Sequence, residues 1–341
     1  MGSWKILDYP ITVFTVSKLT MKRRVFLSSA SALLAGGIVS CSKKCGKSAE
    51  KIPFSATLSG SKLNIFSDKI GGGGGKILFV ADTHIAFPDG LVAPYDGYAA
   101  RMAKYGLRSV GVLEKIVAKA ESEKYAAIIL GGDIFNYPSS KNIKEVLSVL
   151  SSSKVPCHYL AGNHDWHFEG EGGSDSEQRA RWLVALKPLY FGENPLIYSK
   201  KICGVNFVML DNSTYEISRE QLDAFKRVLS EGLPVIVCAH IPFYVPGRDI
   251  FFCGNPEWGA KNDPYYKIER RQPWSPAGVS STTSEFCELL FSAPNVWGVL
   301  AGHIHSQSED WYCGKFQIVA PFGGRGGFVD ISITPTEKQK S

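Results

Sequence analysis

The sequence predicts an α/β fold, because short apolar runs alternate along it with segments of helical periodicity. Five runs have the length and composition of buried strands: Ile77 to Ala81, Ala127 to Leu130, Val155 to Ala161, Leu233 to Ala239 and Val296 to Ala301. About 260 residues follow Lys76, enough for one two-layered domain with a large core. We therefore expect one domain over residues 76–333 and a short tail over residues 334–341.

Three further segments have apolar residues at helical spacing: Leu107 to Ala120, Ile143 to Leu150 and Ser218 to Ser230. Ser218 and Gln221 are three residues apart at the start of the third segment, as the members of a capping box are. Thr282 and Glu285 have the same spacing and predict another helix start. We expect these helices to pack against the sheet.

The segment before the domain, residues 41–75, is mostly polar and ends in the glycine run Gly71 to Gly75. This composition predicts a tether with a flexible joint. An edge strand before the domain is expected at Leu63 to Phe66. A long insertion is predicted at residues 241–281, where six prolines interrupt the pattern. Its aromatic residues, with Trp258 and Trp274 as first candidates, either contact a substrate or form a small core within the loop.

Residues of metal-ligand type follow all five strand-like runs, and five of the seven histidines belong to this set. The segments are Asp82-Thr83-His84, Gly132-Asp133, Gly162-Asn163-His164-Asp165, His240 and Gly302-His303-Ile304-His305. Because ligand sites form where the strands of an α/β sheet end, we expect these side chains to converge on one edge. Carboxylate, amide and imidazole ligands in such a set suit two divalent metals about 3.5–4 Å apart with a shared carboxylate. A pair of this kind binds phosphate and activates water, so hydrolysis of a phosphate ester is the expected reaction.

The order D-x-H, G-D-x-x-N, G-N-H-D, H and G-H-x-H resembles that of the calcineurin-like metallophosphoesterase superfamily, over roughly residues 76–333. The resemblance implies an αββα sandwich of two mixed sheets flanked by helices. It also implies two divalent ions, Mn, Fe or Zn. The implied ligands of one ion are Asp82, His84, Asp133 and His305, with Asp133 shared, and those of the other are completed by Asn163, His240 and His303.

In the family, the histidine at the position of His164 contacts the phosphate and is proposed to protonate the leaving oxygen. Asp165 is expected to orient the His164 ring. The purple acid phosphatase branch has a tyrosine ligand three residues after the shared aspartate, and Asn136 in that position argues against this branch. The expected activity is hydrolysis of a small, nucleotide-like phosphomonoester or phosphodiester; the alternative is a catalytically silent scaffold or metal-binding lipoprotein.

Five residues have more than one interpretation when each is taken alone. Asp133 or Asn163 alone would fit a turn or a helix cap, but the complete ordered set does not. His158 lies inside an apolar run and is expected to pack in a strand, whereas His167 is close enough to the G-N-H-D turn to line a cleft. Arg325, flanked by two glycines on each side, either binds phosphate or belongs to a surface turn.

The first 40 residues are expected to be an upstream extension and a signal peptide, with Met21 as the start of translation. Arg23 and Arg24 precede an apolar stretch of fifteen residues, too short to span a bilayer, and resemble a twin-arginine signal. The stretch ends at Cys41 in a sequence similar to a bacterial lipobox. An exported lipoprotein of the periplasm or cell envelope is expected, anchored through lipid on Cys41; an uncleaved signal anchor is the alternative.

The charge balance of the chain bears on nucleic-acid binding, and its cysteine content bears on disulfide formation. Residues 1–40 carry five basic residues and one acidic residue, so 33 basic and 31 acidic residues remain without them. This near-neutral balance gives no support to a broad nucleic-acid surface. Four of the eight cysteines are candidates for disulfides whose pairing the spacing does not determine: Cys45, Cys253, Cys287 and Cys313. Nor does the sequence indicate an oligomeric state.

Overall fold

The computed structural model describes residues 53–70, 73–88, 90, 100, 110–167, 174–245 and 280–337, which all belong to one unit spanning Cys41–Ser341. The expected signal peptide, Cys41, Trp258 and Trp274 lie outside these residues. Within the described ranges, no helix combines the length and the apolar character needed to cross a membrane.

Two six-stranded sheets form the centre of this unit. The first has the order β1 (Ser55–Ser59), β2 (Lys62–Ser67), β12 (Val329–Pro335), β3 (Gly75–Val80), β4 (Ala127–Gly131) and β5 (Cys157–Leu160). The second has the order β10 (Ser308–Tyr312), β11 (Lys315–Val319), β9 (Val296–Ala301), β8 (Val235–Ala239), β7 (Val205–Leu210) and β6 (Ile197–Ile202). Both sheets are mixed: β3, β4 and β5 are parallel to one another, as are β7, β8 and β9, while β12 is antiparallel to β3 and β6 to β7.

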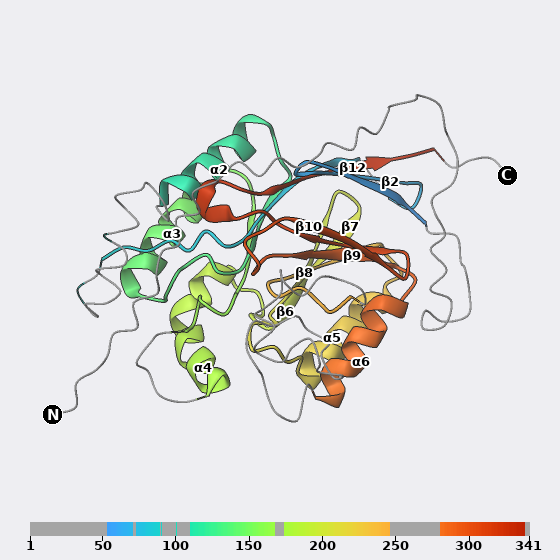
Figure 1. Cartoon of the computed structure of the whole chain (residues 1–341). Coiled ribbons are helices and arrows are strands. Elements are labelled where there is room, and N and C mark those ends of the chain that lie inside the picture. The colour runs from blue at the N-terminus through green and yellow to red at the C-terminus, as the bar shows by residue number, and fades with distance from the viewer. Residues whose placement is uncertain are drawn as a thin grey trace, which may run out of the picture. The chain divides into compact units, whose positions relative to one another are not determined.

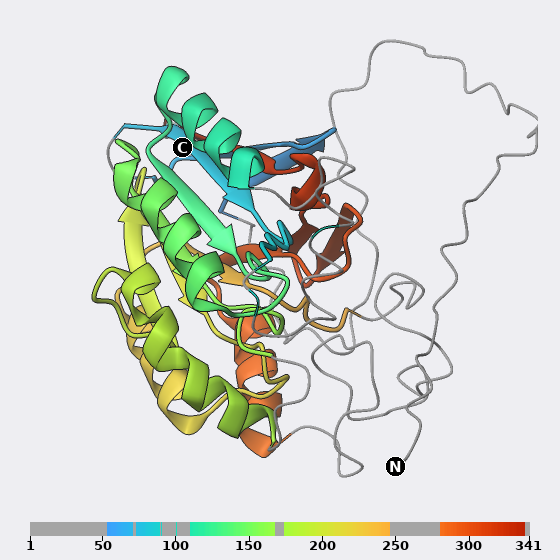
Figure 2. The same cartoon turned by 90° about the vertical axis from the view of Figure 1, so that its left-hand side faces the viewer.

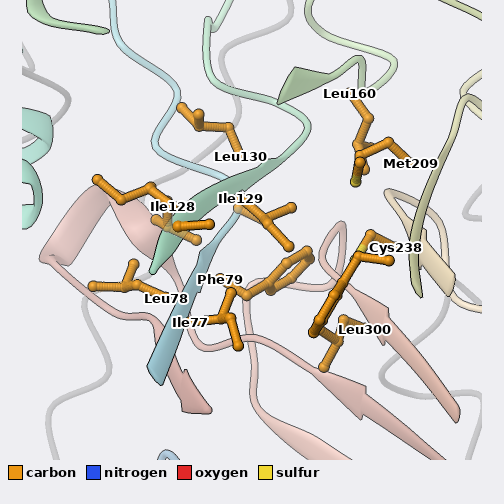
Figure 3. Packing of buried hydrophobic residues seen from close by; sticks show 14 of the residues in the cluster. Ile77, Leu78, Phe79, Ile128, Ile129, Leu130, Leu160, Met209, Cys238 and Leu300 are labelled. Atoms are coloured by element: carbon orange, nitrogen blue, oxygen red, sulfur yellow. The ribbon is translucent and has the colours of Figure 1, made fainter. Parts of the chain in front are cut away.

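Side chains from the two sheets meet in a shared core. Because successive residues of a strand face opposite sides, Ile77, Phe79 and Ile129 point toward Met209, Cys238 and Leu300 of the second sheet, as Figure 3 shows. Leu78, Ile128 and Leu130 point away from that sheet (Figure 3). The strands β4, β8 and β9 are therefore buried on both faces, which explains their continuous apolar runs.

Helices flank the sheets (Figures 1 and 2). α2 (Val110–Ser122) and α3 (Ser140–Ser152) bury apolar residues in the cluster that includes the outward side chains of the first sheet. α5 (Arg219–Ser230) and α6 (Ser281–Ser292) cover the outer face of the second sheet, where Phe225 and Phe286 pack with Val208 and Val237. α4 (Asp175–Leu186) leads into the short 3-10 helix η1 (Lys187–Tyr190). The αββα sandwich is confirmed.

The N-termini of α5 and α6 test the two capping boxes that residue spacing predicted. The capping box at α5 is confirmed, since Ser218 Oγ accepts a hydrogen bond from Gln221 N and Gln221 Oε1 accepts one from Ser218 N. The capping box predicted at Thr282 is wrong: Ser280 caps α6, and Glu285 forms ion pairs with residues of α5 instead. Ser280 has Thr283 three residues later in place of Glu or Gln, so the capping-box spacing favours Thr282 although Ser280 is an equally suitable N-cap residue.

The sandwich includes residues that the sequence assigned to the tether. The strand at Leu63 to Phe66 is confirmed as part of β2, but it is not an edge strand, because β1 pairs with one side of it and β12 with the other. Leu63 and Ile65 are buried in the core shared by the sheets. Among the described cysteines, Cys313 is disulfide-bonded, whereas Cys287 keeps a buried thiol.

Candidate metal centre

Hydrogen bonds between loops hold the metal-ligand segments together just beyond the strand ends. Asp82 N donates to Gly132 O and His84 N to Asp133 O, each at 2.9 Å, so the ladder between β3 and β4 continues into the loops. In the second sheet, Gly302 N donates to His240 O at 2.9 Å. Backbone contacts therefore fix the loops after β3 and β4 relative to each other, and likewise the loops after β8 and β9.

The ligand-type side chains form two groups that share Asp133. Asp82, His84, Asp133 and His305 make one group, and Asp133, His240 and His303 make the other, with ligand atoms of each group within 4.8 Å of one another. Asp133 Oδ2 lies 3.1 Å from His240 Nε2 and 3.7 Å from His84 Nε2, so the same oxygen faces both groups. The family resemblance implied the same two groups with Asn163 added to the second.

The first group brings imidazole nitrogens and carboxylate oxygens to one point. His84 Nε2 and His305 Nε2 are 2.8 Å apart, and His305 Nε2 is 3.3 Å from Asp82 Oδ1. Asp82 is fixed in turn by His303 N, which donates to its carboxylate at 2.8 and 3.0 Å. Two imidazole nitrogens directed at each other beside a carboxylate are a donor set that suits a divalent cation.

Asn163 and His240 supply the test of fit for the second group. Asn163 Oδ1 is buried and accepts no hydrogen bond within the described part of the chain, a rare state for an amide oxygen unless it has a ligand. His240 Nδ1 lies 2.9 Å from Gly131 O, to which it donates, and this leaves Nε2 directed at Asp133. Metal-bound histidines are commonly held in this way by their other nitrogen. The residues present fit a pair of divalent metals.

Buried charge makes the site attractive to cations. Burial opposes charge on His240, but the neighbouring Asp133 carboxylate raises the pKa of this imidazole to about 9. Burial also acts against the Asp133 carboxylate, yet the adjacent histidines hold its pKa well below the usual range. An ionised carboxylate therefore lies at the centre of the two groups and attracts positive charge.

His164 lies beside this centre and outside both ligand groups. Its backbone N donates to Asp133 Oδ1 at 2.8 Å, and its ring packs 4.7 Å from the ring of His84, centroid to centroid. His164 Nδ1 is 3.0 Å from the carbonyl oxygen of Asn136. A backbone carbonyl therefore orients the His164 ring, and a contact of this kind cannot be predicted from side-chain types.

Asp165 does not have the role expected of it. Its two carboxylate oxygens accept hydrogen bonds from Phe135 N at 2.9 Å and from Gly162 N at 2.8 Å. Burial, reinforced by the charge of Asp133, raises the Asp165 pKa to about 7. Asp165 thus joins the loop that carries Asp133 to the loop that carries Asn163, and it does not orient His164.

Two buried amides that the sequence did not single out support the segment after His240. Asn212 exchanges hydrogen bonds with the backbone of Ile241, at 2.7 and 3.0 Å. Gln317 does the same for Phe243, at 2.8 and 2.9 Å. A sequence signal existed for Asn212, since the polar run from Asp211 follows the apolar run of β7 in the way that the ligand segments follow their strands.

Three further candidate residues, Arg325, His158 and His167, lie outside the two ligand groups. The turn η5 (Gly323–Arg325) is held against the Asp82 loop, because Gly323 N donates to Ala81 O and Gly324 N to Asp82 O, and the Arg325 side chain is exposed. His158 is half-buried in β5 and His167 is exposed; neither belongs to a ligand group.

Comparison with solved structures finds matches at low sequence identity. A dimetal phosphatase from Danio rerio matches 77% of this chain and 94% of its own, with 14% identity and a TM-score of 0.49. The Plasmodium protein GAP50, an anchor in the inner membrane complex, matches 74% and 73%, with 13% identity and a TM-score of 0.44. A phosphopantetheinyl hydrolase from Mycobacterium tuberculosis matches 75% and 92%, with 12% identity and a TM-score of 0.38. Similarities this distant carry no information about the substrate.

No curated protein sequence matches the chain well enough to be a recognisable relative. The model of the calcineurin-like phosphoesterase family matches residues 75–307, which include every ligand-type residue of the two groups. The chain belongs to the calcineurin-like phosphoesterase family.

Proposed function

We propose that this protein is a two-metal hydrolase of phosphate esters. The observation that carries the proposal is the pair of ligand groups sharing one Asp133 oxygen, because a shared carboxylate is how two divalent metals are held at bridging distance. The bound metals would supply Lewis acidity toward the phosphate and activate water for attack. Manganese, iron and zinc all suit this mixture of imidazole and oxygen ligands.

His164 is proposed as the general acid. Its backbone N–H anchors it to Asp133, and its Nδ1–H, donated to the Asn136 carbonyl, assigns the ring a tautomer with Nε2 available to hold and deliver a proton. The ring is fixed beside His84 without being one of the ligands of either group. This arrangement suits protonation of the leaving oxygen of a phosphate ester.

The proposed substrate is a small, nucleotide-like phosphomonoester or phosphodiester. The metal pair would recognise only the phosphoryl group, so selection among esters falls to surfaces around it. Arg325 is a candidate, because its turn is hydrogen-bonded to the Asp82 loop and its side chain is exposed. Trp258 and Trp274, outside the described residues, are proposed to stack on a planar leaving group. Replacing either with Ala should lower kcat/KM for the best substrate by about ten- to hundred-fold and spare a small generic ester.

The test compares Asp133→Asn with His164→Gln in metal-reconstituted protein, using a nitrophenyl phosphate ester with Mn²⁺. Asp133→Asn should lower both metal content and turnover, because it removes the shared carboxylate. His164→Gln should keep most of the metal and lose roughly 10²–10⁴-fold in turnover, the usual contribution of general-acid catalysis. Loss of both metals in His164→Gln would make this residue a ligand, and a wild-type protein that binds metal without turnover would favour a silent scaffold.

We also propose that the enzyme is exported and anchored to a membrane through lipid on Cys41. The basic segment around Arg23, the apolar stretch and the lipobox-like sequence support this localisation. Cys41→Ala should release the protein from membranes, because acyl chains supply the anchor. Replacing Arg23 and Arg24 together with Lys should block export by the twin-arginine route, and normal export would indicate the general secretory route instead.

A further inference from the structure

His305 differs from the other histidines of the two ligand groups in its exposure and in its contacts. Its side chain is 29% exposed, whereas those of His84 and His240 are 2% and 0% exposed. It lies in an irregular segment after β9 and has a left-handed backbone, with φ of 60°. Neither burial nor regular secondary structure therefore fixes the orientation of its ring.

The usual hydrogen bond to the second ring nitrogen is also missing at His305. A metal-binding histidine generally donates its other N–H to a carboxylate or a backbone carbonyl, as His240 does to Gly131 O. The polar contacts of the His305 ring are to His84 and Asp82, both through Nε2. Within the residues that the structure describes, Nδ1 of His305 makes no hydrogen bond.

The ring of Phe322 packs on His305 instead. The two ring centroids are 4.7 Å apart and the ring planes are inclined by 32°, while the same phenyl ring lies 6.2 Å from the ring of His84. Close, tilted packing of this kind restricts rotation of the imidazole and so reduces the entropy lost when the ring is fixed on a metal.

Phe322 is itself held by the glycine-rich turn that follows it. A Cβ on Gly324 would lie 2.5 Å from Cζ of the Phe322 ring, so only glycine lets the ring rest there. The Phe322 carbonyl accepts hydrogen bonds from Arg325 N at 3.2 Å and from Gly327 N at 3.1 Å. Gly324 N donates to Asp82 O at 2.9 Å, which ties the turn to a segment carrying a ligand of the same group.

We propose that Phe322 is a positioning residue that orients His305 for the metal of the first group, in place of the missing hydrogen bond. The glycines on both sides of Arg325 then serve the metal centre by seating this ring, whether or not Arg325 binds phosphate. The proposal rests on the proposed two-metal function and assigns Phe322 an effect on one metal only.

The test is to titrate the metal-free, full-length protein with Co²⁺. Binding is measured by calorimetry and by the visible absorption of bound cobalt. Phe322→Leu should weaken one of the two binding steps by about 10–100-fold, as loss of an orienting partner does, and leave the other within about threefold. Phe328→Leu is the matched control: this half-buried ring, six residues further on, contacts Lys119 of α2, and its loss should leave both steps unchanged.

A double-mutant cycle separates positioning from general packing. If Phe322 acts through His305, then His305→Ala and His305→Ala with Phe322→Leu should have the same metal affinity at both steps. Additive losses, equal weakening of both steps, or unchanged binding in Phe322→Leu would each overturn the proposal. A wild-type protein that takes up no metal would refute the proposed function itself, and the Phe322 proposal with it.

Discussion

Gly162→Ala places a methyl group where the loop after β5 touches the loop that carries Asp133. A Cβ on Gly162 would lie 2.2 Å from Asp133 Oδ1 and 2.4 Å from Asp133 N, whereas ordinary contact begins at 3.4 Å. The carboxylate or one of the loops must therefore move by roughly 1 Å, because packed interiors yield little. The backbone of Gly162 does not have a positive φ, so the substitution tests crowding and adds no backbone strain.

The expected result is loss of the shared ligand geometry with a moderate loss of stability. Overpacking of this kind typically lowers the free energy of unfolding by about 1–3 kcal/mol, a loss that urea denaturation can measure. A displacement of about 1 Å at the shared carboxylate should lower turnover of a nitrophenyl phosphate by at least 10²-fold. Metal content, measured by elemental analysis of purified protein, should fall below two ions per chain.

Gly73→Ala is the control, because a Cβ at Gly73 would meet nothing within 4 Å and its φ is not positive. This variant should keep wild-type metal content and turnover, with a free energy of unfolding within about 0.5 kcal/mol of wild type. A Gly162→Ala protein that retains both metals and full turnover would show that Asp133 tolerates displacement. That result would contradict the placement of its Oδ2 between the two groups.

Asp165→Asn should lower the free energy of unfolding of the metal-free protein by about 1–3 kcal/mol, because one amide oxygen cannot accept from both Phe135 N and Gly162 N. Unchanged urea denaturation would mean that one of these hydrogen bonds contributes nothing. Burial, aided by Lys200, lowers the His158 pKa from 6.5 to about 4, so the folded protein loses stability as the pH falls from 6.5 toward 4. His158→Gln should remove up to about 2 kcal/mol of that loss, and parallel stability curves for the two proteins over this range would contradict the assignment.

Much of the fold was predictable because the central strands are buried on both faces. Such strands appear in the sequence as continuous apolar runs, and β3, β4, β5, β8 and β9 all fall within or beside the five runs identified there. Six strands were not predicted: β1, β6, β7, β10, β11 and β12. In β1 and β10 the residues alternate between partly buried and exposed positions. Alternation over five residues is a weak signal against a polar background.

The identities of the candidate ligands were predictable, but their supports were not. Side-chain types at the strand ends predicted that these residues converge, and the family resemblance implied two groups that share Asp133. The contacts that orient His164 and His240 come from the carbonyl oxygens of Asn136 and Gly131, and every residue has a carbonyl oxygen. The support of His305 by Phe322 joins segments whose proximity depends on the assembled sheets. Backbone acceptors and long-range packing leave no residue-type signature in a single sequence.

Backbone conformation explains why aspartate and histidine at these positions have glycine neighbours. Among the described residues, ten that are not glycine have positive φ, and half of them are candidate ligands: Asp82, His84, Asp133, His303 and His305. Each such conformation costs on the order of 1 kcal/mol, so together they consume a sizeable part of the usual stability of a domain. The left-handed turns direct the side chains back toward a single point. The neighbouring glycines, which have no side chain, leave room for the ligand residues to pack closely. Gly302, for example, would place a Cβ 2.6 Å from Asp82 Oδ2. Backbone hydrogen bonds between the loops hold this arrangement, so the strain is borne by the folded protein.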